Sequence, residues 1–173
     1  DPNSLRLIGI FSVIYRAWAC HVAKVMLRWV DTWAPPGLKG GLQKRECADV
    51  FVAVACSISV ATAEDANIAG ATGDVEKYFD MAPRIPMRDA AVAWGMPRAF
   101  MDGRLKFANQ VRRRFRVAGS VGTPWRSTTG TPQGDPIAVP EAIMLVAVWH
   151  IMMSRELGTT RHFSWIDNVQ WID

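Results

Sequence analysis

Apolar and polar residues follow one another along this chain with periods that predict both helices and strands. Five segments carry apolar residues at three- and four-residue steps or in long runs, as helices with a buried face do. Gly95 and Pro97 separate two of these segments, because proline does not continue a helix interior. The predicted helices cover residues 12–33, 46–64, two short segments between 87 and 107, and 137–157.

Shorter runs predict strands. The one that ends at or near Asp74 is expected to be buried. The pair Asp167-Asn168 tolerates positive φ and therefore suits the tip of a tight hairpin near the C-terminus. Helices together with a small set of strands indicate the α+β class. The predicted strands cover residues 5–10, 66–75, 112–117, 162–166 and 169–172.

Composition narrows the class of protein. Half of the 173 residues are apolar and 21% are charged, which is typical of a globular chain with one sizeable core. The longest apolar stretch, 137–153, contains Pro140 and Glu141 and is shorter than the roughly 20 residues of a membrane span. It is interpreted as a buried helix, and no membrane partner is predicted. A net charge of +4 suits a polyanionic partner.

The three cysteines are an odd number and have no C-x-x-C spacing, so they indicate neither a disulfide framework nor a zinc site. They are expected to be reduced, buried thiols. With no signal peptide visible, an intracellular protein is expected, in an unknown compartment.

Two aspartates and one loop are the candidates for chemistry. Asp74 follows a strand and Asp167 lies at a hairpin tip, and carboxylates from neighbouring strands are ligands that Mg²⁺ prefers. Residues 130–136, Gly-Thr-Pro-Gln-Gly-Asp-Pro, precede the longest helix. Their glycines allow close backbone approach, and Gln133 offers an amide with donors and acceptors.

The order of these segments resembles reverse transcriptases, the RNA-directed DNA polymerases, of the non-LTR retrotransposon and group II intron branch. The segments that carry this resemblance are Gly-Asp-Val-Glu-Lys-Tyr-Phe-Asp at 73–80 (motif A), the loop at 130–136 (motif B), Trp-Ile-Asp-Asn at 165–168 (motif C), and the fingers stretches at 4–16 and 39–49. It implies one continuous fragment without a thumb: partial fingers over 1–65 and a palm over 66–173, with a small antiparallel sheet backed by helices.

The resemblance also implies a reaction and its partners. The expected activity is template-directed DNA synthesis by phosphoryl transfer with two Mg²⁺ ions, for which Mn²⁺ is a possible substitute. The expected partners are an RNA or DNA template with its primer, deoxynucleoside triphosphates, and the fused domains of a longer retroelement polyprotein.

Motif-by-motif matching gives each residue an expected role. Phe79 is a bulky gate that excludes a 2′-hydroxyl, and Asp80 is expected to be structural. The implied site consists of Asp74 and Asp167 as catalytic metal ligands, Asn168 as a third ligand, and Arg6, Phe79, Gln133 and Gly134 as substrate contacts.

Three alternatives stay open. The family has Asp where this chain has Asn168, and the lost charge predicts weaker metal binding, so an inert or decayed palm that only binds nucleic acid is one alternative. An RNA-templated RNA polymerase is another, although Phe79 favours deoxynucleotides. The basic run at 112–116 is interpreted either as a track for a nucleic-acid backbone or as an exposed strand face.

Overall fold

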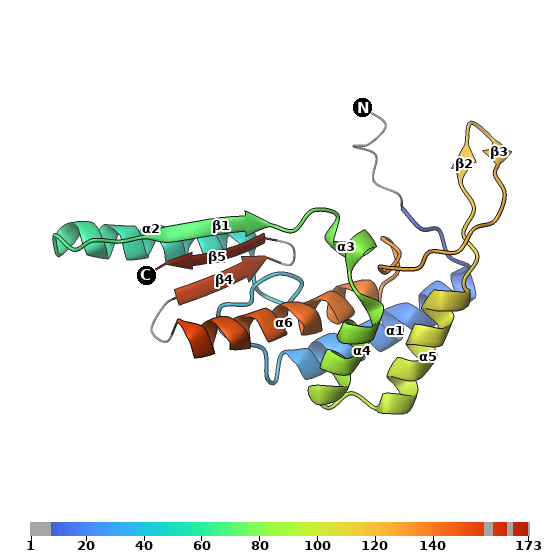
Figure 1. Cartoon of the computed structure of the whole chain (residues 1–173), viewed down its shortest axis with the longest axis horizontal. Helices are drawn as coiled ribbons and strands as arrows, with labels where there is room; N and C mark the ends of the chain where they lie inside the picture. The colour runs from blue at the N-terminus through green and yellow to red at the C-terminus, as the bar shows by residue number, and fades with distance from the viewer. Residues whose placement is uncertain (1–7, 158–160, 166–167, 173) are drawn as a thin grey trace.

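A computed structural model describes residues 8–157, 161–165 and 168–172 of the chain, and its elements are drawn in Figure 1. The helices are α1 (Val13–Val30), α2 (Cys47–Ala63), α3 (Tyr78–Met81), α4 (Arg84–Ala93), α5 (Arg98–Gln110) and α6 (Ala138–Glu156). The strands are β1 (Gly70–Asp74), β2 (Arg116–Val117), β3 (Ser120–Val121), β4 (Arg161–Trp165) and β5 (Asn168–Ile172).

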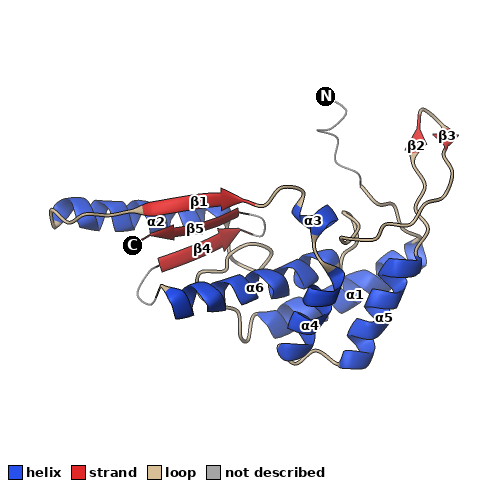
Figure 2. Cartoon of the chain, in the orientation of Figure 1, coloured by secondary structure: helices blue, strands red, loops and turns tan. Residues whose placement is uncertain are grey.

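Three strands form an antiparallel sheet in the order β1-β5-β4, and β2 and β3 form a separate hairpin (Figure 2). Helices α2 and α6 both contact β4. His150 on α6 and Ser164 on β4 are joined by a buried hydrogen bond of 2.7 Å between Nε2 and Oγ. A small antiparallel sheet among helices is consistent with the predicted α+β class.

Helix α6 is the centre of the hydrophobic core. Its residues Ile143, Met144 and Ala147 are fully buried, and α1 and α4 both contact it. By length and composition α6 is long and apolar enough to cross a membrane, but half of that window is buried inside the fold. This is what the core helix of a folded domain looks like, as the sequence predicted.

The helix boundaries have local causes. The Ser12 hydroxyl accepts a hydrogen bond from the Tyr15 N–H and begins α1. Glu46 and Asp49 form a reciprocal capping box at the start of α2. Gly95, at φ +101°, follows the end of α4, and Pro97 precedes α5, so the predicted break is confirmed.

The strand predictions were less accurate. Strand β1 covers only 70–74 and is mostly exposed, because it lies at the edge of the sheet and is built from small residues. Residues 8–10 have no regular structure, and 5–7 lie outside the described residues. Of the strand predicted at 112–117, only its last two residues are a strand. The predicted hairpin exists, but Asn168 begins β5 instead of lying at the tip.

Two further features differ from the sequence analysis. The short helix α3 was not predicted, and it follows Lys77, which has a left-handed backbone at φ +49°. The cysteines were expected to be buried, yet Cys20, Cys47 and Cys56 are all exposed. The division into fingers over 1–65 and palm over 66–173 stays a prediction.

Candidate active site

The predicted aspartate Asp74 ends β1, directly opposite Asn168 in the antiparallel register. Trp165 pairs with Asn168 across the β4–β5 hairpin, so Asp167 belongs to the two-residue connection 166–167, which lies outside the described residues. The sheet therefore brings motif A against motif C. Arg6 also lies outside the described residues.

The surroundings of Asp74 fit a metal ligand. Its side chain is exposed, and among the described residues it has no ion pair or hydrogen-bonding partner, so its oxygens are free for a cation. Within those residues no group of three ligating side chains comes together. The metal site expected here stays a prediction, since Asp167, its second expected ligand, lies outside the described residues.

The loop at 130–136 and the preceding Thr129 are hydrogen-bonded to α3, the helix that carries Phe79, and to its C-cap. The Gly130 N–H donates to the carbonyl of Ala82 at 3.0 Å, and the Thr131 N–H donates to the carbonyl of Phe79 at 2.7 Å. The Thr129 hydroxyl donates to the carbonyl of Asp80 at 3.0 Å. Motifs A and B are thus in direct backbone contact.

Glycine is required at the point of closest approach. Gly130 has φ +70°, and a Cβ built on it would lie 2.2 Å from the carbonyl oxygen of Asp80. Only a residue without a side chain fits there. On the other side of the loop, a Cβ on Gly134, at φ +98°, would lie 2.6 Å from the carbonyl oxygen of Gly9.

Gln133 and Phe79, the predicted substrate contacts, are both half-buried. The Gln133 carbonyl accepts a hydrogen bond of 2.6 Å from the Gly9 N–H, and its side-chain Nε2 donates to Asp80 Oδ2 at 3.4 Å. The ring of Phe79 meets Tyr78 edge-on at 5.7 Å. Asp80 thus accepts one long hydrogen bond from the Gln133 amide, and its structural role stays a prediction.

A buried arginine holds the start of the loop. Arg84 Nε donates to the carbonyl of Gly130 at 2.8 Å, and Nη2 donates to the carbonyl of Thr129 at 2.8 Å. Its Nη1 donates to the carbonyl of Ser127 at 2.8 Å and to Asn109 Oδ1 at 2.9 Å. Burial, and then the charge of Arg113, lower the pKa of Arg84. The four acceptors offset the cost of burying this cation.

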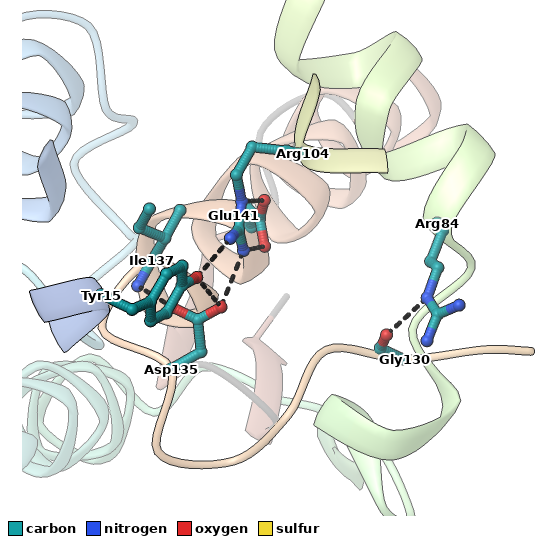
Figure 3. Close-up of polar contacts among 7 residues, drawn as sticks. All are labelled: Tyr15, Arg84, Arg104, Gly130, Asp135, Ile137 and Glu141. Atoms are coloured by element: carbon teal, nitrogen blue, oxygen red, sulfur yellow. Dashed lines mark hydrogen bonds and ion pairs between the residues drawn. The ribbon is translucent and has the colours of Figure 1, made fainter. Parts of the chain in front are cut away.

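A second buried arginine holds the end of the loop, as Figure 3 shows. Arg104 on α5 pairs with Glu141 on α6 through two contacts, Nε–Oε1 at 2.9 Å and Nη2–Oε2 at 3.1 Å. Its Nη2 also contacts Asp135 Oδ2 at 3.0 Å. The Tyr15 hydroxyl accepts from Arg104 Nη1 at 2.7 Å and donates to Asp135 at 2.8 Å. One cation thus serves two buried carboxylates.

Burial and pairing shift the pKa values in this cluster. Burial raises the pKa of Glu141, which the Arg104 charge only partly offsets. Burial opposes the charge of Arg104, but Glu141 and Asp135 outweigh it and hold the pKa of Arg104 above its usual range. Arg104 therefore stays charged. This cluster is a structural anchor for the loop.

The sequence analysis did not find these two anchors. Glu141 carried a visible signal, because it is an acid inside an otherwise apolar helical run and needs a buried cation. Arg84 and Arg104 carried none, since each lies in an ordinary amphipathic helix. Asp135 has no role of its own in the sequence analysis, where it is only one residue of the loop at 130–136.

The scan of known protein families and the search of curated proteins each found no match. A solved structure of apo telomerase from Candida tropicalis, truncated from its C-terminal domain, has a similar fold, with a TM-score of 0.55 and 8% sequence identity. The similarity covers 91% of this chain and 34% of the telomerase chain. This chain thus shares a fold with about a third of a polymerase related to reverse transcriptases, and at this identity the likeness is one of fold alone.

Proposed function

We propose that this chain is the palm and part of the fingers of a template-directed polymerase that makes DNA from deoxynucleotides on an RNA or DNA template. The observation that carries the proposal is the sheet register, in which Asp74 lies opposite Asn168 and so beside motif C. The fold shared with telomerase and the backbone contacts between motifs A and B support it.

The residues have distinct parts in this proposal. Asp74 and Asp167 would hold two Mg²⁺ ions, with Asn168 as a weaker ligand. The ions would activate the attacking hydroxyl and neutralise the triphosphate. Phe79 would limit the space at the sugar, and the loop would present Gln133 and Gly134 to the nucleotide.

Primer extension on an RNA template tests the activity. We expect the chain to incorporate deoxynucleotides and not ribonucleotides. Asn168→Asp should increase the incorporation of deoxynucleotides, and Asp74→Asn should abolish it. If the chain and its Asn168→Asp variant both fail with Mg²⁺ and with Mn²⁺, the polymerase proposal is wrong.

Binding of Mn²⁺, followed by electron paramagnetic resonance, tests the metal site without requiring turnover. The affinity is expected to fall after Asp74→Asn and to rise after Asn168→Asp, because each change alters the negative charge at the site. A matched control is Asp102→Asn, an exposed acid on α5. Equal affinity for Mn²⁺ in all variants would show that Asp74 is not a metal ligand.

One observation favours a second candidate, an inert palm that only binds nucleic acid. The strand position opposite Asp74 carries an amide, Asn168, where the family has a carboxylate. Metal binding that stays weak after Asn168→Asp, together with retained binding of a primer and template, would favour this candidate over the enzyme.

A further inference from the structure

The basic run at 112–116 belongs to a hairpin arm, residues 111–126, that stands away from the helices (Figure 1). The arm contains five arginines and no acidic residue. The whole chain has 20 basic and 16 acidic residues, so the remainder has 15 basic residues against 16 acidic ones. The positive net charge of this chain is therefore located in the arm.

The arm is held in shape by its own contacts. Arg113 and Trp125 exchange two backbone hydrogen bonds of 2.9 Å, and the Gly122 N–H donates to the carbonyl of Phe115 at 2.9 Å. The rings of Phe115 and Trp125 stack at 5.5 Å, and the guanidinium of Arg113 lies 5.6 Å from the Trp125 ring. Arg113 is thus a half-buried part of the hairpin base.

The other four arginines of the arm are instead available to bind a ligand. Arg112, Arg114, Arg116 and Arg126 are all exposed. Across the described residues none of the four forms an ion pair or a side-chain hydrogen bond. At the base of the arm, the Nε and Nη2 of Arg113 and the Nε1 of Trp125 also find no acceptor in the described part of the chain. The arm is rich in donors and has no acid of its own to neutralise them.

We propose that the arm binds the backbone phosphates of a nucleic-acid strand through Arg112, Arg114, Arg116 and Arg126. Guanidinium groups match phosphate oxygens in charge and in geometry, and such contacts read no sequence. The inference rests on the proposed polymerase function, since it assigns a surface for the template or primer. It adds four residues outside motifs A, B and C.

Fluorescence anisotropy with a labelled single-stranded DNA oligonucleotide tests the proposal. The arm variant replaces the four exposed arginines with glutamine. The matched control removes the same charge from exposed positions elsewhere, by Lys24→Gln, Arg28→Gln, Arg98→Gln and Arg155→Gln. We expect at least about a tenfold loss of affinity in the arm variant and a much smaller loss in the control, with the salt slope reduced by about 0.7 for each phosphate contact removed.

Two further probes isolate the phosphate contact. An oligonucleotide with uncharged methylphosphonate linkages should bind the wild-type chain as weakly as the arm variant binds ordinary DNA. Replacing the same four arginines with lysine should restore most of the part of the binding that depends on charge. An unchanged urea midpoint of the glutamine variant shows that its loss of binding is not misfolding. Equal loss in the arm and control variants, tight binding of the uncharged oligonucleotide, or no binding by the wild-type chain would each overturn the proposal.

This result is separable from the polymerase assay, because binding is measured without nucleotide addition. Arm-dependent binding without any primer extension would contradict the proposed activity and leave the phosphate surface standing. Primer extension together with equal binding by the arm and control variants would support the proposed activity and contradict the phosphate surface.

Discussion

Asp74 ends strand β1 and Asp135 belongs to the loop before α6. Both aspartates belong to the candidate site, but one is exposed and the other is buried. Asp74 is exposed at a sheet edge and has no partner among the described residues. The Asp135 side chain is 0% exposed and contacts Tyr15, Arg104 and the Ile137 N–H. The contrast separates two uses of one residue type, because an exposed carboxylate with free oxygens is available to a ligand, whereas a buried carboxylate needs protein partners to offset its lost hydration.

The largest effect is expected where the buried cation is removed. Arg104→Met would leave Asp135 and Glu141 buried without a counter-charge, which costs about 3–5 kcal/mol of the free energy of unfolding. Arg98→Met, on the exposed start of the same helix, is the control and should change stability by less than about 0.5 kcal/mol. Urea denaturation of both variants measures the difference. Similar midpoints would mean that the cluster is not an anchor.

The next largest effect concerns the contact between the loop and α3. Gly130→Ala forces a Cβ into the carbonyl of Asp80 at a positive φ and should cost at least about 2 kcal/mol. Gly103→Ala is the control, since a Cβ there meets no atom within 4 Å on helix α5 and should stabilise by about 0.5–1 kcal/mol. Thermal unfolding would show opposite shifts. Two shifts of the same sign would contradict the close approach of Gly130 to the carbonyl of Asp80.

A smaller effect is a change in pH dependence. The pKa of Glu141 is raised in the folded chain by burial, so above the ordinary glutamate pKa of about 4.3 the unfolded chain releases a proton that the folded chain retains. Stability contributed by Glu141 is therefore lost as pH rises from that value toward the raised pKa. Glu141→Gln should remove this part of the slope, whereas Glu156→Gln, exposed on the same helix, should leave it. Urea midpoints from pH 4 upward test the sign.

The smallest effect sharpens the opening comparison directly. Asp74→Asn and Asp135→Asn are the same chemical change at an exposed and at a buried site. The first should alter the free energy of unfolding by less than about 0.5 kcal/mol. The second should cost about 1–3 kcal/mol, because the amide cannot replace the ionised acceptor of Arg104 and Tyr15. Chemical denaturation of the pair is sufficient, and equal losses would reject the distinction.

The helices were predictable because their signals are local. Apolar periodicity located α1, apolar runs located α2 and α6, and the Gly95 and Pro97 break located the boundary between α4 and α5. The exposure of β1 was not predictable, since it depends on the place of the strand at the edge of the sheet as well as on its small residues. The turn into α3 was hidden because Lys77 is an unusual residue for a left-handed backbone.

In the candidate site, too, features with a local sequence signal were predictable and contacts between distant residues were not. The spelling of motifs A, B and C predicted that Asp74 and the loop belong to one site, and the structure brings motif A against both of the others. The anchors were not predictable, because Arg104 lies 31 residues from Asp135 and 37 from Glu141 in the chain. Such pairings are products of the tertiary fold. The roles of Phe79 and Gln133 as substrate contacts stay predictions.

The two glycines of the loop also limit how its length can change. Gly130 lies against the backbone of α3 and Gly134 against the backbone at Gly9, so the three residues between them connect two backbone contacts. An insertion or deletion among these three residues would break one of the two contacts, whatever residue was added or lost. Homologous chains should therefore keep this interval constant even where the intervening side chains vary. Interval length would then be a better marker than residue identity for detecting distant relatives.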